Sequence, residues 1–554
     1  MNITHQAKWL ILITLLINAA AMLSPIINGG DSITYAALSQ HIALNNDWAN
    51  LVLDGNDWLD KPHMPFWITA LFFKLGGVSA FTYILPGFLF HLVGAYYTWR
   101  IARLFYGRET AWLSVLVYVS VYHLMDSSIE VKAETYLTGF IMGACYYWLR
   151  YDAQAKLKYL LLGALFSACA VMTKGVFTLI TITSGLVCMW MYRRQWHKLW
   201  SGKWLLALAL SLLFTAPEVI ALYRQFDLHP EKVVFGQTHV SGIKFFLWDS
   251  QFGRFFNTGP IKNTNGNPFY FVLVFLWAFL PWVAVFVAAM VAGARQFFAP
   301  DAEGRARFVF LCGAFFVTFL LFSATSFQLD HYTVILFPFA AILCGKFLRD
   351  WLARQGDSRV LFIVQLAVAV LLAGLAVGLS VYVANRIVMT VVLGMFVVLL
   401  AYGYVMRRQL RAGAVLAYPV FGIAMVYTFL VLTNALTFTA CSVAHNAAVQ
   451  LAGKPDAPVY VYQMDIVARE LGLYDSSPCY AVDDPGQLPK TGRFYFLVRQ
   501  SQLEQLRAHL GRFEQMGQGE WVVHKTGTFP RFLRLAKGTE PLEDIRILQV
   551  EGVK

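Results

Sequence analysis

The sequence predicts a polytopic α-helical membrane protein with a small soluble α/β domain at its C-terminal end. Charged residues make up only 14% of the 554-residue chain, whereas hydrophobic residues make up 58%. Soluble domains usually carry about 25% charged residues, so this composition suits a non-aqueous environment. In addition, apolar segments long enough to span a bilayer recur along most of the chain.

About thirteen spans are expected from these segments. The first is interpreted as a retained span, because it is longer than a signal-peptide core and no small-residue cleavage motif follows it. Residues 1–440 are therefore predicted to form a transmembrane domain. The expected spans lie near residues 8–28, 79–99, 109–124, 134–150, 158–173, 176–192, 204–223, 269–294, 308–324, 332–348, 360–383, 387–406 and 413–438.

Basic residues cluster in alternate turns between these spans, which predicts the orientation of the chain. The positive-inside rule places the basic turns in the cytoplasm, with a cytoplasmic N terminus and an extracytoplasmic C terminus. These turns also account for the net charge of +12. No basic stripe with interleaved aromatic residues is present, so nucleic acid is not expected as a partner. The turns lie near residues 100–108, 150–158, 193–203, 295–307, 346–359 and 407–411.

The opposite, extracytoplasmic face receives two long loops, residues 29–78 and 224–268, and the C-terminal segment. In the first loop, apolar residues at helical spacing predict amphipathic helices lying along the membrane surface; they are Tyr35, Leu38, Ile42, Trp48 and Leu51.

The C-terminal segment, residues 441–554, is predicted to be a soluble α/β domain. PVYVYQ and RFYFLVR have strand patterns, while DIVARELGLY and SQLEQLRAHLGRF have helical spacing. Cys441 and Cys479 could form a disulfide there.

Charged residues at the edges of apolar spans are costly to desolvate and therefore mark candidate functional positions. Asp31 follows the first span, either as a catalytic or orienting carboxylate or as the N-cap of a helix. Lys61, which follows Asp60 at the end of the first loop, would suit a lipid-borne phosphate. Snorkelling of a lysine at the membrane boundary is the alternative.

Other candidates lie further along the chain, each with a purely structural alternative. Glu134 opens the fourth span within a charged turn, where its negative charge would also interact favourably with the helix dipole. Lys174 lies at a break between two short spans, where the following glycine could simply end a helix. Arg254 belongs to an excess of basic residues in loop 224–268, which an anionic ligand would explain. His331 and Tyr332 begin a later span, where a histidine often has a structural role.

Several motifs of soluble enzymes do not occur. The sequence has no G-x-x-x-x-G-K-[ST], no H-E-x-x-H, no paired C-x-x-C and no D-x-D pattern. Nucleotide sugars are cytoplasmic, so a transferase that works on the outer face needs a donor that reaches it through the membrane.

An ordered set of segments resembles a known superfamily. The segments are GGDSITYAALSQHI, DWLDKPHMPFW, VKAETYLTGF, AVMTKG, QFGRFF with NPFYF and LPW, and LLFSATSFQLDHYTVILFPFAAIL. Together they resemble the bacterial branch of the protein O-mannosyltransferase superfamily, the type C glycosyltransferases. The likeness is strongest to the lipid A 4-amino-4-deoxy-L-arabinose transferases and covers residues 10–345.

The resemblance implies a multi-pass enzyme of the bacterial inner membrane with a periplasmic active site. Such an enzyme takes a sugar from undecaprenyl phosphate and transfers it with inversion to lipid A or lipopolysaccharide, another envelope glycan or a protein. A transporter or flippase of lipid-linked sugars is the alternative. The expected roles are catalysis by Asp31 and Glu134, donor-phosphate binding by Lys61, Arg254 and Lys174, and substrate contacts from Tyr35, Asp60, His331 and Tyr332.

Four positions depart from the pattern of these enzymes. Ser32 replaces a second acidic residue, and Asp60 replaces a glutamate that in the aminoarabinose transferases helps to bind a metal. Asn265 stands where they have a histidine, and Gln328 where they have a lysine. A divalent metal with Asp60 as a ligand is therefore possible but not specifically predicted. We expect the sugar or the acceptor to differ, and the polyprenyl-phosphate donor to be kept.

Overall fold

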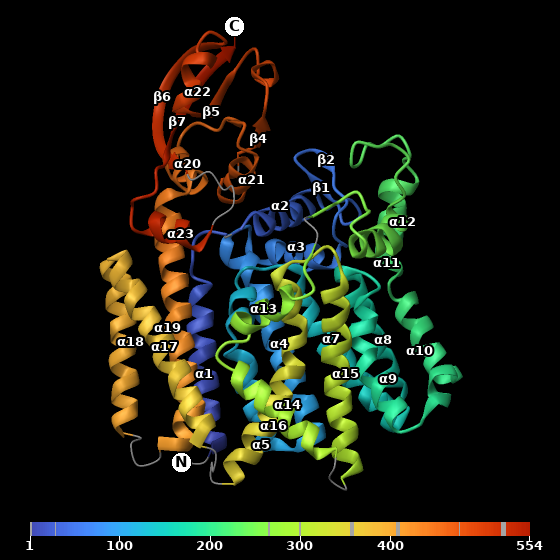
Figure 1. Ribbon diagram of the computed structural model, residues 1–554. Helices are drawn as coiled ribbons and strands as arrows, with labels where there is room; N and C mark the ends of the chain where they lie inside the picture. Colours follow the sequence, from blue (N-terminus) through green and yellow to red (C-terminus); the bar gives the residue numbers. More distant parts are fainter. Residues whose placement is uncertain are drawn as a thin grey trace.

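The computed structural model describes residues 3–27, 29–263, 266–297, 301–354, 359–405, 410–475, 477–521 and 528–553. Long helices form an upright bundle, and two helices of the first loop lie across one end of it (Figure 1). A β-sheet domain stands beyond that end, while the N terminus lies at the opposite end. This arrangement confirms the prediction of a largely helical, polytopic membrane protein.

Eight helical segments in the described part of the chain are long and apolar enough to cross a membrane. The third of them runs continuously through α10 (Gly202–Leu213), α11 (Ala216–Leu222) and the π-helix η2 (Tyr223–Asp227). The fifth combines the 3-10 helix η4 (Asp330–Leu336) with α16 (Phe337–Ala353). The others are α4 (Ala80–Tyr106), α8 (Leu157–Lys174), α15 (Ala302–Ala324), α17 (Arg359–Val383), α18 (Arg386–Val405) and α19 (Leu410–Cys441).

The remaining predicted spans are helical but shorter, less apolar or broken, so the count of about thirteen stays a prediction. The span predicted over 269–294 is not one straight helix: α13 (Tyr270–Ala278) and α14 (Val283–Gln296) meet at 112°, as in a broken span or a re-entrant loop. Pro281 lies in the break, and proline cannot donate a helical hydrogen bond. The span predicted over 109–124 also ends early, at Val119. The other helices at predicted spans, shorter or less apolar than the eight above, are α1 (Ile3–Ala21), α5 (Arg108–Val119), α7 (Ala133–Gln154) and α9 (Thr178–Tyr192); the short helix α6 (Tyr122–Ser127) follows α5.

The first loop contains α2 (Gly30–Asn45), a hairpin of β1 (Val52–Leu53) and β2 (Asn56–Asp57), and α3 (Met64–Gly76). Tyr35, Leu38 and Ile42 are buried on one face of α2, as their spacing predicts. Trp48 and Leu51 lie beyond the helix, because the C-cap Asn46 turns the chain with a left-handed φ of 54°. The N-cap is Gly29, so the capping role considered for Asp31 is wrong.

The second loop contains α12 (Gly242–Lys244) and the π-helix η3 (Phe245–Gly253), whose C-cap is Arg254. This helix brings Arg254 back to the end of the bundle, beside the first loop. Another connection, between α9 and α10, contains the 3-10 helix η1 (Trp196–Trp200).

The C-terminal segment folds around a five-stranded sheet with the order β4-β3-β5-β7-β6. β3 pairs in parallel with β4 and β5, and β7 pairs antiparallel with β5 and β6. The elements are α20 (Val443–Leu451), β3 (Val459–Tyr462), α21 (Asp465–Tyr474), β4 (Cys479–Val482), η6 (Pro485–Gln487), β5 (Arg493–Arg499), α22 (Gln500–Leu506), β6 (Leu510–Trp521), α23 (Phe529–Ala536) and β7 (Glu543–Val553).

Two predictions for this segment are corrected. The helix expected to continue through GRF ends at Leu506, because the chain from Leu510 onward pairs with β7 as a strand. The considered disulfide does not form, since Cys441 and Cys479 are both free.

The sheet domain rests on the first loop through α21. Gln40 of α2 donates a hydrogen bond to the Gly472 carbonyl over 2.6 Å, and Arg469 pairs with Asp54 at 2.5 Å. The backbone N–H of Ile27 donates to the Tyr474 hydroxyl over 3.3 Å. The segment that carries Asp31 is therefore held between the helix bundle and the C-terminal domain.

Candidate functional site

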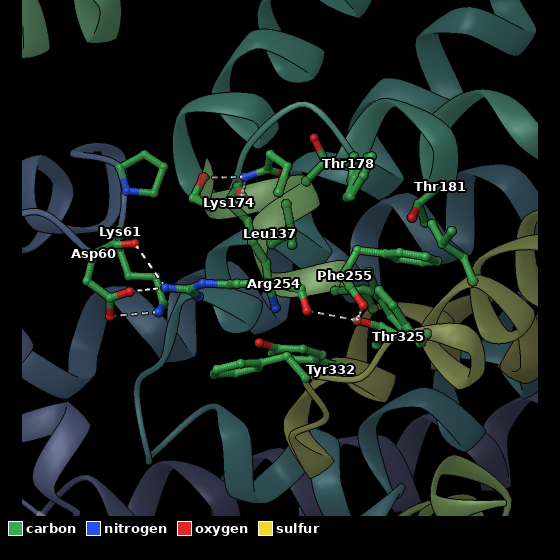
Figure 2. Close-up of a pocket in the computed structure, with 18 residues that line it drawn as sticks. Asp60, Lys61, Leu137, Lys174, Thr178, Thr181, Arg254, Phe255, Thr325 and Tyr332 are labelled. Carbon is green, nitrogen blue, oxygen red and sulfur yellow. Dashed lines mark hydrogen bonds and ion pairs between the residues drawn. The ribbon is translucent and has the colours of Figure 1, made fainter. Parts of the chain in front are cut away.

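A cavity of about 100 Å³ lies under the first loop, at the end of the bundle (Figure 2). Its charged lining consists of three cations, Lys61, Lys174 and Arg254, and one carboxylate, Asp60. Figure 2 shows Asp60 and Lys61 on one side, with Arg254 directed toward them. Most of the other lining residues are apolar, with a few hydroxyl and amide groups; they are Pro62, Leu137, Phe177, Thr178, Thr181, Ser250, Gln251, Phe255, Leu321, Phe322, Thr325, Phe327, Tyr332 and Ile335.

Asp60 is shared between two cations. The Lys61 ammonium lies 2.9 Å from one carboxylate oxygen, and the Arg254 guanidinium pairs with the other. Burial opposes ionisation, but the charges of Lys61 and Arg254 lower the pKa of Asp60. Burial and the neighbouring Arg254 lower the pKa of Lys61. Two cations against one carboxylate leave an excess positive charge at the cavity wall, which favours an anionic ligand.

Lys174 is the third cation of the cavity and has a different set of partners. It ends α8 and forms an ion pair with Glu134, in the first turn of α7. Its ammonium lies 3.6 Å from the centre of the Tyr332 ring, a cation–π contact. His331 Nε2 lies 3.8 Å from the second Glu134 oxygen, and His331 Nδ1 lies 3.2 Å from Asp330. The structure therefore brings together four residues predicted from three separate segments: Glu134, Lys174, and the neighbouring pair His331 and Tyr332.

Glu134 stands behind this cation rather than in the cavity. Only 4% of its side chain is exposed, and it is not among the lining residues. Its contacts with Lys174 and His331 favour a role in positioning Lys174 over direct contact with a substrate.

Asp31 and Tyr35 lie on α2, beside the cavity but outside its lining. Asp31 is exposed, in the first turn of the helix. Tyr35 is buried edge-on against Phe66, with ring centres 5.1 Å apart. Burial, followed by the charges of Asp60, Asp31 and Glu134, raises the pKa of Tyr35 well above its ordinary value. A protonated tyrosine thus lies within the field of the three carboxylates that the sequence singled out.

The residues present do not fit a divalent metal at Asp60. Both carboxylate oxygens are engaged by Lys61 and Arg254, so a metal would have to displace two cations. Among the residues that the structure describes, no group of three or more His, Cys, Asp or Glu side chains is placed to hold a metal ion. Asn265 lies outside the described residues. Gln328 instead accepts a hydrogen bond from the Asn267 backbone over 2.9 Å.

Some residues that shape the site were not predicted. His63 and Glu218 form a buried pair next to Lys61, although 155 positions separate them in the sequence. Gln251 donates a hydrogen bond to the Lys174 carbonyl over 3.2 Å and packs against Gly175. Gly175 is the C-cap of α8, which confirms that it ends the helix.

Known proteins share both sequence and fold with this chain. A sequence model of the family described as dolichyl-phosphate-mannose-protein mannosyltransferase matches residues 60–220. An undecaprenyl phosphate-α-4-amino-4-deoxy-L-arabinose arabinosyl transferase of Erwinia tasmaniensis is 26% identical over 321 residues, which cover 56% of this chain and 54% of that protein. A protein with the same description from Pseudomonas paraeruginosa is 25% identical over 354 residues, or 61% of this chain and 59% of that one. The matches thus span little more than half the length of these relatives.

The likeness in fold extends over nearly the whole chain. The crystal structure of ArnT from Cupriavidus metallidurans bound to undecaprenyl phosphate superposes with a TM-score of 0.73 and covers 98% of both chains, at 18% identity. The apo structure of the same protein gives a TM-score of 0.72. The overall fold described above is therefore the fold of these two structures, including the region beyond residue 345, where the motifs give no guidance.

Proposed function

We infer that this chain, a type C glycosyltransferase by its fold and its ordered motifs, transfers a sugar from a polyprenyl-phosphate donor to an acceptor at the outer face of the bacterial inner membrane. One observation carries the proposal: Lys61, Lys174 and Arg254 converge from three separate segments on a cavity with mostly apolar walls. A lipid-linked sugar phosphate has the matching chemistry, an anionic diester joined to an apolar chain.

The cations act on the departing phosphate. In an inverting displacement the bond between the anomeric carbon and the phosphate oxygen breaks, and negative charge grows on the phosphate. Lys61 and Arg254, held in place by Asp60, stabilise this charge more in the transition state than in the ground state. Lys174 contributes a third charge, with Glu134 as its buried partner.

Asp31 takes the proton of the attacking acceptor group or orients that group for attack. It is exposed on the first turn of α2, close to the cluster around Tyr35, and its carboxylate is not tied to a helix cap. Tyr35, Asp60, His331 and Tyr332 are proposed to contact the donor sugar and its phosphate.

The acceptor is proposed to be an envelope lipid, with lipid A as the first candidate, because the motifs resemble those of lipid A aminoarabinose transferases. The relatives described above as undecaprenyl phosphate-α-4-amino-4-deoxy-L-arabinose arabinosyl transferases are consistent with this choice. The departures at Ser32, Asp60 and Gln328 favour a different sugar or a different acceptor on the same donor lipid. Transport of lipid-linked sugars is not favoured, because the charged residues of the candidate site gather at one end of the bundle.

A direct transfer assay tests the proposal. Purified protein is incubated with radiolabelled undecaprenyl-phosphate sugars and with lipid A, lipopolysaccharide or envelope protein, and the products are separated from the donor. We expect label to move to one acceptor, and Asp31→Asn and Lys61→Ala to abolish transfer while the protein inserts and purifies normally. Wild-type protein that neither binds undecaprenyl phosphate nor labels any acceptor would overturn the proposed function.

A further inference from the structure

A fully buried histidine–glutamate pair lies beside the cation site. The side chains of His63 and Glu218 are both 0% exposed, and His63 Nδ1 lies 2.9 Å from one carboxylate oxygen of Glu218. The His63 backbone N–H donates to the other oxygen over 3.0 Å. One carboxylate therefore fixes both the ring and the main chain of a residue two positions after Lys61.

The contacts of the ring fix its orientation. Nδ1 faces the Glu218 carboxyl group, and Nε2 lies 3.2 Å from the carbonyl oxygen of Ala49. Both ring nitrogens therefore have a polar partner inside the protein, and turning the ring would break both contacts.

The pair joins two of the three segments that supply the phosphate-binding cations. His63 follows Lys61 across the rigid residue Pro62, in the first loop. Glu218 lies in α11, which continues into η2 and the loop that carries Arg254. Gln225 of η2 strengthens the junction: its amide donates to the Leu51 carbonyl over 2.8 Å and accepts from the Leu51 N–H over 3.0 Å.

We propose, resting on the donor-phosphate role of Lys61, that His63 and Glu218 are positioning residues that hold Lys61 against Arg254 and Asp60. A buried polar pair of this kind restricts geometry, because either partner left without the other in the interior is strongly unfavourable. A short connection through proline transmits that restriction to the Lys61 ammonium.

A double-mutant cycle on the binding of undecaprenyl phosphate, the carrier lipid of the donor, tests this proposal. The dissociation constant of undecaprenyl phosphate is measured in detergent for the wild type, Lys61→Ala, His63→Gln and the combined variant. If His63 acts through Lys61, His63→Gln weakens binding about tenfold in the wild-type background but less than about twofold when Lys61 is already alanine. Glu218→Gln should behave in the same way. Equal weakening in both backgrounds would overturn the proposal.

Two further variants separate positioning from loss of folding. The paired change His63→Leu with Glu218→Leu removes both buried polar groups together, so the fold should persist while donor binding still weakens. His91→Gln is the matched control, because His91 is another buried histidine, in α4 and stacked on Tyr118. It should leave donor affinity unchanged. If the paired leucine variant folds and binds undecaprenyl phosphate as tightly as the wild type, the positioning role is wrong.

The same data distinguish failure of this proposal from failure of the proposed function. Lys61→Ala alone must weaken binding if Lys61 holds the phosphate. Unchanged binding in Lys61→Ala would refute the phosphate role of Lys61 itself, and with it the basis for any positioning by His63.

Discussion

The ammonium of Lys174 lies 3.6 Å from the centre of the Tyr332 ring. Glu134 pairs with the same ammonium, so the lysine is held between a carboxylate and an aromatic face. Lys174 is the last residue of α8, and Tyr332 lies in η4, which precedes α16. The contact keeps the third cation of the cavity in place without neutralising it by a second carboxylate.

Removing the aromatic ring should weaken donor binding. Tyr332→Leu deletes the cation–π contact, and we expect the affinity for undecaprenyl phosphate to fall about three- to tenfold. Tyr332→Phe keeps the ring and should retain most of the affinity. Binding measurements on the two variants, with thermal stability recorded alongside, check this. If leucine binds as well as phenylalanine, the ring does not support Lys174.

The turn after Lys174 should require glycine. Gly175 has a φ of +108°, and a Cβ atom there would collide with the Gln251 side chain. Gly175→Ala is expected to lower thermal stability and to weaken donor binding by shifting Lys174. Adding Gln251→Ala removes the collision but not the backbone strain, so binding should recover only in part.

The matched control for this substitution is Gly374→Ala. An added Cβ at Gly374, in α17, meets open space, so the helix should be unaffected or slightly stabilised. Wild-type binding by Gly175→Ala would mean that this turn does not set the position of Lys174.

The cost of placing charges beside apolar spans explains why part of the site could be predicted from sequence. Lys61 and Lys174 are charged residues beside apolar segments, and such residues carry a desolvation cost that needs a reason. Arg254 stood out for a different reason, the excess of basic residues in an outer loop. The separate segments of these three cations do converge on one cavity. The partner of each cation could not be predicted, because the pairings depend on how distant helices pack.

Glu218 shows what the sequence conceals. It lies within a segment that reads as an apolar span, and its partner is 155 residues away. The strand from Leu510 to Trp521 was missed for a related reason: it pairs with β7, at the far end of the chain. Local spacing reports amphipathicity, whereas both features depend on contacts between residues remote in sequence.

Chelators should leave the enzyme active. Because Lys61 and Arg254 occupy both oxygens of Asp60, we expect transfer and donor binding to be unchanged after treatment with excess EDTA. Elemental analysis of the purified protein should find no stoichiometric metal. Loss of activity with EDTA, restored by a divalent ion, would show that a metal replaces one of these cations in the working enzyme.

Labelling of cysteines introduced one at a time should place the first loop outside the cytoplasm. Asn56 is exposed in the hairpin of that loop, and Lys156 is exposed in a basic turn between α7 and α8. In intact cells a membrane-impermeant maleimide should modify Asn56→Cys but not Lys156→Cys. After lysis the reagent should modify both variants. The unmodified chain controls for its seven native cysteines. The reverse pattern would invert the topology and remove the proposed active site from the periplasm.

The C-terminal domain should lose stability as the pH rises toward neutral, through Glu470. This carboxyl group is buried, with the Ser442 hydroxyl 3.1 Å away, and burial raises its pKa to about 7 from an ordinary value of 4.5. The folded state therefore holds a proton that the unfolded chain releases above pH 4.5. The contribution is complete below pH 4.5 and is lost as the pH rises to about 7, by an amount on the order of 3 kcal/mol. Glu470→Gln cannot ionise, so its melting temperature relative to the wild type should increase across this range, whereas the exposed Glu504→Gln should show a constant difference. A constant difference for Glu470→Gln as well would mean that this carboxyl group is ionised in the folded domain.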